Sequence, residues 1–329
     1  MTRKRRQFSY RPGRLLASMA VLAMAAVASG PLSAADYPKR DITFVVPYAP
    51  GGGSDQQARR LQAGLEKALG VNLRIVYKTG GGGAVGFLEL HSSKADGYTI
   101  ANVVVPNIVV TSRGDDVGYK AAGFSYIGMT EQAVGALCVP KDSKFKTLKD
   151  LVAYAKENPG NLTIAGTGST GHGNFAEIVH ALGIKATYVP VSGGVGKAVP
   201  MLQGGHVDAA VFASSHAAKH AGTIKALGIA GSNPSPALPD APTFKSLGYK
   251  GFEMATTWGV MAPPGTPADV VKILNDALKK AVSDPTVRDA QIKNGLTPMS
   301  QTPEQANEFV ADAAASVDRT EKLLKTLEK

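Results

Sequence analysis

The chain has 329 residues, 44% of them hydrophobic and 19% charged, which is typical of a folded globular protein and excludes a disordered or fibrous one. The length suggests about two domains. The formal net charge of +10 is concentrated at one end: six basic and no acidic residues lie in the first 35 positions, and the remaining 30 basic and 26 acidic residues lack the clustering of a nucleic-acid-binding face.

The N-terminal segment, residues 1–35, is typical of a secretory signal peptide. Basic residues at 3–6 precede an apolar run over 15–29, and small residues suited to cleavage follow at 33–35. The apolar run is shorter than the roughly 20 residues that span a bilayer, so we do not expect a membrane anchor. Residues 5–8 (RRQF) also resemble a twin-arginine motif. We therefore expect export to the periplasm, by the Sec or the twin-arginine pathway.

Strands and helices alternate in the next part of the chain. Short β-branched runs predict strands, and apolar residues at helical spacing predict helices, the first of which ends at Gly70. The single cysteine, Cys138, lies in an apolar run and predicts a buried thiol in a strand, with no internal disulfide. The predicted elements are a strand at 41–47, a helix at 56–69, a strand at 72–77, a helix at 84–92 and a strand at 98–105.

The alternation restarts near residue 148. Prolines between 222 and 246 indicate that much of that stretch is surface loop, and residues 256–262 predict a strand that returns the chain to the first series. This pattern predicts the α/β fold class, with two domains that are each a mainly parallel sheet flanked by helices. The predicted strands are 162–165, 186–189, 207–213 and 226–230, and the predicted helices are 148–157, 174–182, 268–282, 285–294 and 303–327.

The two series also predict where the domains divide. Residues 36–139 and 257–329 are expected to form a discontinuous first domain, and residues 140–256 the second. The ligand cleft would lie between them, with a hinge near Pro140 and Thr256.

Two glycine-rich loops, one in each predicted domain, follow a strand and precede a helix. Ligands of parallel sheets bind at the carboxyl ends of the strands, where glycines let backbone N–H groups approach closely and helix N-termini add partial positive charge. The pair of loops therefore predicts a site for a small carboxylate. Alternatively, the glycines only shape turns, while Ser54 or Asp55 caps a helix. The candidate residues are Ala49, Pro50, Gly51, Gly52, Gly53, Ser54, Asp55, Gly166, Thr167, Gly168, Ser169, Thr170, Gly171 and His172.

Three further candidates lie at the ends of predicted strands. Asn107 and Ser214 follow strands whose ends would face the cleft. Asp208 begins an apolar strand, where its carboxylate would accept hydrogen bonds from a ligand or organise the cleft, or would equally cap a backbone turn.

The second loop contains a dinucleotide-binding pattern that is incomplete. Gly166, Gly168 and Gly171 form G-x-G-x-x-G after a strand and before a helix, but residues 188–194 lack the acidic residue that would hold a ribose. We therefore expect no nucleotide cofactor.

The same loop does not form a hydrolase motif. Thr167 stands where a nucleophile elbow centred on Ser169 requires glycine. We expect no enzyme activity; an exported hydrolase using His172 and Asp208 is the alternative.

One histidine pair has the spacing of metal ligands. His216 and His220 would share a helix face, as zinc ligands do, but no third ligand is evident in the sequence. We expect a solvated helix face and no metal site.

Five segments match, in order, the motifs of one known family. They are residues 37–38 with 42–55 (YP and ITFVVPYAPGGGSD), 95–99 (ADGYT), 202–212 (LQGGHVDAAVF), 238–243 (LPDAPT) and 262–267 (APPGTP). With these motifs the chain resembles the Bug, or TctC-like, receptors of tripartite tricarboxylate transporters along nearly the whole chain after residue 35.

The resemblance implies a periplasmic-binding-protein (Venus flytrap) fold that captures a small carboxylate: an organic acid, an aromatic acid or an amino acid. It implies that loops 48–55 and 166–174 hold the carboxylate, which adds Tyr48 and Asn174 to the candidates. The implied partners are this ligand and the membrane components of the transporter, and we expect a monomer. A sensory receptor that signals to a kinase would share the binding step. At 189–194 the chain reads VPVSGG where the family commonly has VPYKGG, which argues against a highly charged ligand such as citrate.

Overall fold

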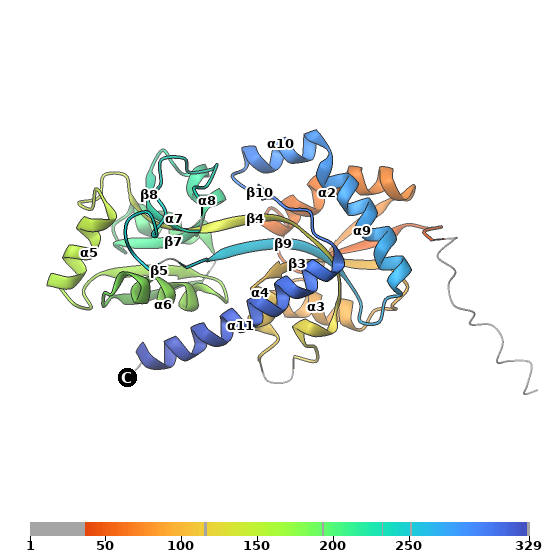
Figure 1. Cartoon of the computed structure of the whole chain (residues 1–329), viewed down its shortest axis with the longest axis horizontal. Helices are drawn as coiled ribbons and strands as arrows, with labels where there is room; N and C mark the ends of the chain where they lie inside the picture. The colour runs from red at the N-terminus through yellow and green to blue at the C-terminus, as the bar shows by residue number, and fades with distance from the viewer. Residues whose placement is uncertain (1–36, 115–116, 193, 232, 251, 328–329) are drawn as a thin grey trace, which may run out of the picture. The chain divides into compact units, whose positions relative to one another are not determined.

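One mixed sheet connects the two halves of the chain (Figure 1). The structure, a computed structural model, describes residues 37–114, 117–192, 194–231, 233–250 and 252–327; the predicted signal peptide, residues 1–35, lies outside them. In these described residues ten strands form the sheet, in the order β2-β1-β3-β9-β4-β7-β5-β6, with β10 and β8 also paired to β4. No helix in the same residues is long and apolar enough to cross a membrane.

In the order of the sheet, the first lobe contains β2, β1, β3, β9 and the first part of β4. Strand β1 is parallel to β2 and β3, whereas β9 lies antiparallel between β3 and β4. Its elements are β1 (Ile42–Val46), α2 (Gly53–Leu69), β2 (Leu73–Tyr77), η2 (Gly81–Gly83), α3 (Ala84–His91), β3 (Thr99–Val105), α4 (Asn107–Thr111), η3 (Ala121–Gly123), β4 (Ser125–Pro140), β9 (Ala255–Ala262), α9 (Ala268–Ser283), α10 (Pro285–Lys293), β10 (Thr297–Pro298) and α11 (Pro303–Leu327).

In the order of the sheet, the second lobe contains the last part of β4, then β7, β5 and β6. Strand β5 is parallel to β6 and β7, and β4 is antiparallel to β7 and β8. The sheet is therefore mixed rather than uniformly parallel in both lobes. The elements of the second lobe are α5 (Leu148–Glu157), β5 (Thr163–Thr167), α6 (Gly171–Leu182), β6 (Thr187–Val191), α7 (Val195–Gln203), β7 (Ala209–Ala213), α8 (Ser214–Lys219) and β8 (Ile224–Ala230).

Local sequence explains where helix α2 packs and ends. Leu61, Leu65 and Leu69 recur at helical spacing and are buried on the face that meets the sheet. The helix stops at Gly70, which adopts φ +72° and donates its N–H to the carbonyl oxygen of Glu66, as a left-handed C-cap does.

Helices cover both faces of the sheet in the second lobe. Successive side chains of β4 therefore point alternately into two different hydrophobic cores. Leu137 and Val139 pack into the core beneath α5 and α6. Ala136 and Cys138 face the opposite core, which α7 and α8 cover. The thiol of Cys138 is fully buried in the strand, as expected from its apolar neighbours.

Strand β4 passes from one lobe into the other. The strand pairs with β9 as far as Val134 and with β7 from Gly135 onward. Pro140 pairs with Ile224 of β8 and therefore lies inside the second lobe. The change of partner comes five residues before the predicted boundary, because apolar residues continue through the crossing and give no signal there.

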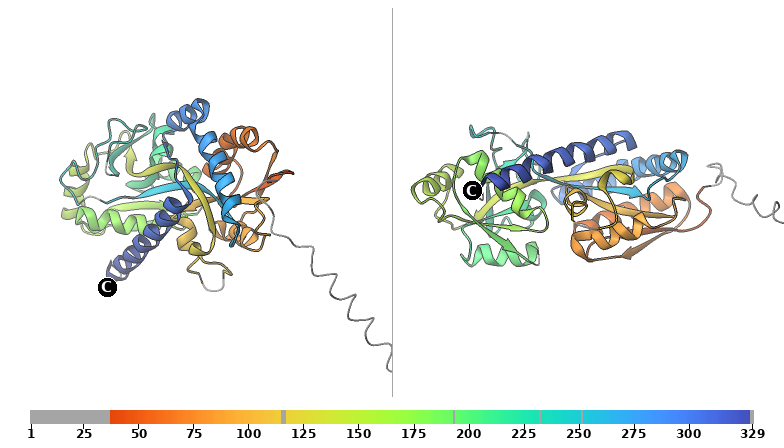
Figure 2. Two further views of the ribbon diagram at one scale, coloured as in Figure 1. Left: turned by 45° about the vertical axis from the view of Figure 1, so that its right-hand side comes forward. Right: turned by 90° about the horizontal axis from the view of Figure 1, so that it is seen from below.

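The C-terminal helix α11 contacts both lobes, although the sequence placed it with the first alone. Arg113 of the first lobe pairs with Asp318 at 2.7 Å and with Glu321 at 2.8 Å. The Thr320 hydroxyl, which lies between them in sequence, donates to a carboxylate oxygen of Glu177 in α6 at 2.6 Å. Two further views show α11 running alongside β4 (Figure 2).

Candidate functional site

A cavity of about 490 Å³ is lined by residues of both lobes. It lies at the carboxyl ends of β1, β3, β5 and β7, which is where parallel sheets bind their ligands. Thirteen predicted site residues line it: Tyr48, Ala49, Pro50, Gly52, Gly53, Ser54, Asn107, Gly166, Thr167, Gly168, Thr170, Gly171 and Asn174.

The first loop is held in shape by the buried carboxylate of Asp55. One carboxylate oxygen accepts a hydrogen bond from the Gly51 N–H at 2.7 Å, and the other accepts from the Tyr77 hydroxyl at 2.7 Å and from Arg59 at 2.8 Å. Gly51 itself adopts φ +82°, which favours glycine. Asp55 and Gly51 thus shape the loop from behind, and neither is part of the cavity wall.

The pKa of Asp55 follows from these contacts. Burial alone would raise the pKa, but the hydrogen bonds from Tyr77, Gly51 and Arg59 outweigh burial and lower the pKa below its ordinary value. The ionised carboxylate is therefore the form that holds the loop.

Trp258 forms part of the cavity wall and rests directly on the first turn of α2. A Cβ atom placed on Gly53 would lie 2.8 Å from the indole ring, so a side chain at this position cannot coexist with the ring where it stands. Trp258 comes from β9, where Thr256 projects from the same face of the strand and also lines the cavity.

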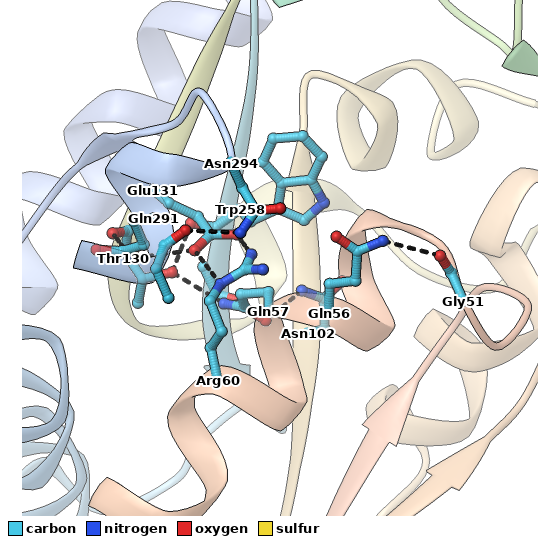
Figure 3. Close-up of polar contacts among 12 residues, drawn as sticks. Gly51, Gln56, Gln57, Arg60, Asn102, Thr130, Glu131, Trp258, Gln291 and Asn294 are labelled. Carbon is cyan, nitrogen blue, oxygen red and sulfur yellow. Dashed lines mark hydrogen bonds and ion pairs between the residues drawn. The ribbon is translucent and has the colours of Figure 1, made fainter. Parts of the chain in front are cut away.

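A buried polar network fixes the backbone beneath Trp258 (Figure 3). The Thr130 hydroxyl donates to the Trp258 carbonyl oxygen at 3.1 Å and accepts from the Gln57 amide at 2.9 Å. Gln57 in turn accepts from Asn102 at 2.7 Å. Because these groups are buried and bonded to one another, they hold the indole at a defined place in the wall.

An ion pair belongs to the same network. Arg60 of α2 pairs with the nearly inaccessible carboxylate of Glu131, which also accepts a hydrogen bond from Gln291 of α10 at 3.0 Å. The network thereby ties α2, β4 and α10 together behind the cavity.

The second loop depends on close packing of two glycines. A Cβ atom on Gly166 or on Gly171 would lie 2.8 Å from the ring or hydroxyl of Tyr188, so β5 and the start of α6 approach each other only without side chains there. Gly168 between them adopts φ +69° and turns the chain.

Three helices of nine or more residues begin at the cavity, as do the shorter α4 and α8. Gly52, Thr170 and Gly194 are the N-cap residues of α2, α6 and α7, and in none of these three does a side chain cap the helix. The first N–H groups of a helix have no partner within it, and they carry partial positive charge. The arrangement suits an anion.

The described wall contains no Lys, Arg, Asp or Glu side chain; its ionisable side chains are Tyr48 and His216. Burial, with a smaller contribution from Tyr119, raises the pKa of Tyr48, so its hydroxyl stays neutral. Burial, together with Lys219 and His220, lowers the pKa of His216 below 6.5, so this imidazole is neutral at pH 7.

Side chains of the two lobes also meet near the cavity. The Asn107 amide donates to the Ser169 hydroxyl oxygen at 3.2 Å, which joins α4 of the first lobe to the second loop. Lys219 of α8 donates to the Gln56 side-chain oxygen of α2 at 3.4 Å. Ser169 thus contacts the opposite lobe, although it is not among the residues of the wall.

Three predicted site residues are not brought to the cavity. His172 stacks on Tyr188, with ring centroids 4.7 Å apart. Asp208 accepts hydrogen bonds from the N–H and hydroxyl of Thr163. Thr163 begins β5, whereas the cavity lies at the other end of this strand. Ser214 is buried and donates to the Gly295 carbonyl oxygen at 3.4 Å. Local partners therefore occupy all three side chains.

Sequence reasoning missed several residues of the wall. His216 was expected on a solvated helix face but lines the cavity, because α8 starts directly at the end of β7. A signal for Trp258 was available, since it stands two residues after Thr256 on one face of a predicted crossing strand. The other missed residues are Val104, Pro106, Gly135, Gly194, Val195, Val211, Phe212, Ala213, Met254, Ala255 and Thr256.

Comparison with known proteins gives consistent results. The model of a family described as "Tripartite tricarboxylate transporter family receptor" matches residues 57–328. Protein BugT of Bordetella pertussis is 32% identical over 91% of this chain and 94% of its own length.

Two solved structures are also similar. An R. palustris protein solved with adipate has a TM-score of 0.78 at 27% identity and covers 88% of this chain and 99% of its own. MatC from Rhodopseudomonas palustris, solved with bound malate, has a TM-score of 0.72 at 27% identity and covers 88% of this chain and 100% of its own.

Proposed function

The chain belongs to the tripartite tricarboxylate transporter family of receptors, and from this premise we propose that it captures a small carboxylate between its two lobes and delivers it to the membrane components of such a transporter. Three helices of nine or more residues, α2, α6 and α7, begin at one cavity without side-chain caps, and this is the observation that carries the proposal. Their N–H groups offer a carboxylate several charge-assisted hydrogen bonds, each contributing about 1.5–3 kcal/mol.

The proposed binding residues are the thirteen predicted residues of the wall, with Gly194, His216 and Trp258 added. The similar structures solved with malate and adipate support a carboxylate as the ligand class. An affinity near 1 μM corresponds to about 8 kcal/mol, which a few such hydrogen bonds and partial burial of the ligand can supply.

We propose that the receptor closes around its ligand. A ligand that touches both glycine-rich loops gains all its contacts only when the lobes approach, so binding shifts the population toward the closed form. The proposed lobes are residues 38–134 with 255–327, and 135–254, which places the hinge where β4 changes partner and where β9 begins.

No catalytic step is proposed. The hydrolase alternative requires His172 and Asp208 to act together on a bound ligand, but each side chain is engaged elsewhere and neither lines the cavity. Binding and release of an unchanged ligand is the activity that the site supports.

The proposed location is the periplasm and the proposed state a monomer. Both follow the predicted signal peptide and the family's receptor role. Expression of the full chain with its own N-terminal segment tests the location: we expect the protein in the periplasmic fraction, shortened near residue 35.

The binding proposal is tested on protein purified from that fraction. Thermal unfolding is followed with a panel of carboxylic acids and, as matched controls, their amides. A ligand at 100 times its Kd stabilises the folded state by about 2.7 kcal/mol, so we expect an acid to raise Tm by several degrees and its amide to have little effect. Mass spectrometry should recover the acid unchanged. Amides that stabilise as well as acids, or a converted ligand, would contradict the proposal.

A further inference from the structure

One part of the cavity wall, called the floor here, is apolar, whereas the two glycine-rich loops, called the rims, present polar backbone. Tyr48, Val104, Ala213 and Trp258 line the cavity and belong to one hydrophobic cluster, whose centre includes Ala133. The polar backbone of the two glycine-rich loops lies at the rims. A ligand that bridges the loops therefore spans an apolar surface.

The second lobe extends this apolar surface. Val211 and Phe212 at the end of β7, Val195 in the first turn of α7 and Met254 before β9 all line the cavity. Met254 packs against the crossing point of β4, where a side chain on Gly135 would collide with it. Apolar residues of the wall thus come from both lobes and from the crossing strands.

Charge is missing from this surface. The described wall has no Lys or Arg side chain, and burial, together with the charges of Lys219 and His220, lowers the pKa of its single imidazole, His216. The three helix N-termini supply partial positive charge, but only to atoms that reach their N–H groups. A second carboxylate lying over Trp258 and Phe212 would lose its hydration without gaining a charged partner.

We propose, resting on the function proposed above, that the ligand is a monocarboxylate with an apolar body, aliphatic or aromatic, whose carboxylate binds at the glycine-rich loops while its body covers Trp258 and Phe212. The body gains from leaving water against an apolar floor. In this preference the receptor would differ from the two R. palustris proteins, whose solved ligands, malate and adipate, carry two carboxylates.

Matched ligands of equal length test the class. Binding of hexanoate, adipate and hexanamide is measured by calorimetry on the protein purified from the periplasmic fraction, with benzoate, terephthalate and benzamide as the aromatic series. We expect at least one monocarboxylate to bind ten times more tightly than both its dicarboxylate and its amide.

The outcomes separate the two proposals. If adipate or terephthalate binds as tightly as the monocarboxylate while the amides do not bind, the apolar-body proposal is wrong and the carboxylate receptor stands. If an amide binds as tightly as its acid, both proposals are wrong. If no acid in either series binds, the apolar-body proposal is wrong, and the panel of carboxylic acids decides whether the carboxylate receptor stands.

A variant pair tests the floor directly. Thr256 is half-buried in the wall and pairs with Ala133 in the register of β4 and β9. Thr256→Lys should raise the ratio of adipate to hexanoate affinity at least tenfold, because it places a cation on the floor. Thr256→Met, similar in length but uncharged, should leave this ratio within about threefold. If the affinity ratio changes equally in both variants, the ligand body does not lie over this part of the wall. A thermal melt of each variant verifies that it is folded.

Discussion

Gly53 shows how a missing side chain shapes the binding cavity. Its backbone begins α2 at the rim, and the indole of Trp258 occupies the space that a Cβ would need. The buried hydrogen bond from Thr130 holds the Trp258 backbone, so the ring cannot retreat with its strand.

Gly53→Ala should therefore weaken binding as well as stability. We expect the ring to be displaced into the cavity, with about tenfold weaker binding of the carboxylate identified in the panel, and a loss of ~1–3 kcal/mol of stability from overpacking. Calorimetry and urea unfolding measure the two effects. Gly222→Ala is the control, because a Cβ at that position meets no other atom within 4 Å. Equal binding by both variants would show that the contact with Trp258 does not shape the site.

His216 makes stability depend on pH. Its folded-state pKa is lowered, first by burial and then by Lys219 and His220, so the unfolded chain takes up a proton at higher pH than the folded chain. Stability should fall as the pH drops through 6.5 toward the folded-state pKa.

His216→Gln removes this proton uptake. We expect its Tm to fall less than that of the unchanged protein between pH 7.5 and 5, as measured by calorimetric scans. His206→Gln alters an exposed imidazole and should follow the unchanged protein. If Tm falls equally with pH in His216→Gln and in the unchanged protein, His216 is not the cause of the pH dependence.

At the scale of elements, the first loop and α2 form a unit that Asp55 holds together. Asp55→Asn replaces an ionised acceptor by a neutral amide, which weakens the contacts with Gly51, Tyr77 and Arg59. We expect a loss of about 1–3 kcal/mol in urea unfolding at pH 7, whereas the exposed Asp289→Asn should change stability by less than ~0.5 kcal/mol.

The pH profile provides a second test of Asp55. Its folded-state pKa is lowered, so its contribution is fully present above its ordinary value of 3.8 and disappears as the pH falls through the folded-state pKa. The stability difference between the unchanged protein and Asp55→Asn should be constant above pH 5 and shrink below pH 4. A constant difference down to pH 3 would exclude ionisation as its cause.

Elements could be predicted from the sequence where the residues that determine them lie within one short segment. Helix α2 was predictable because its apolar spacing and Gly70 lie within one segment, and the glycine-rich loops were recognisable by composition. Strand β4 was predicted only around Cys138, near its C-terminal end. The rest was missed because a strand that is buried on both faces shows no alternation of apolar and polar residues. Asp208 illustrates the same limit, since a carboxylate that bonds Thr163 and one that bonds a ligand have the same sequence signal.

At the scale of the whole molecule, the two lobes should respond to ligand together. Hydrogen exchange should slow in loops 48–54 and 166–171 when the carboxylate identified in the panel is added, because a ligand held by both loops orders both. Peptides from α5, whose residues are absent from the cavity wall, should be unaffected. Protection of one loop alone would contradict binding between the lobes.

The relation between the lobes was only partly predictable. The strand–helix alternation and the returning strand indicated two domains with a discontinuous first one. The position where β4 changes partner, and the contact of α11 with α6 through Thr320 and Glu177, depend on packing between distant segments. No local pattern encodes such contacts.

Trp258 is the single tryptophan of the chain, and it stands in the cavity wall. The protein therefore carries its own optical probe: selective excitation of the indole reports on one position, with no background from a second tryptophan. Arrival of a ligand should alter the emission of this residue directly, so uptake and release can be timed by stopped-flow fluorescence without any label.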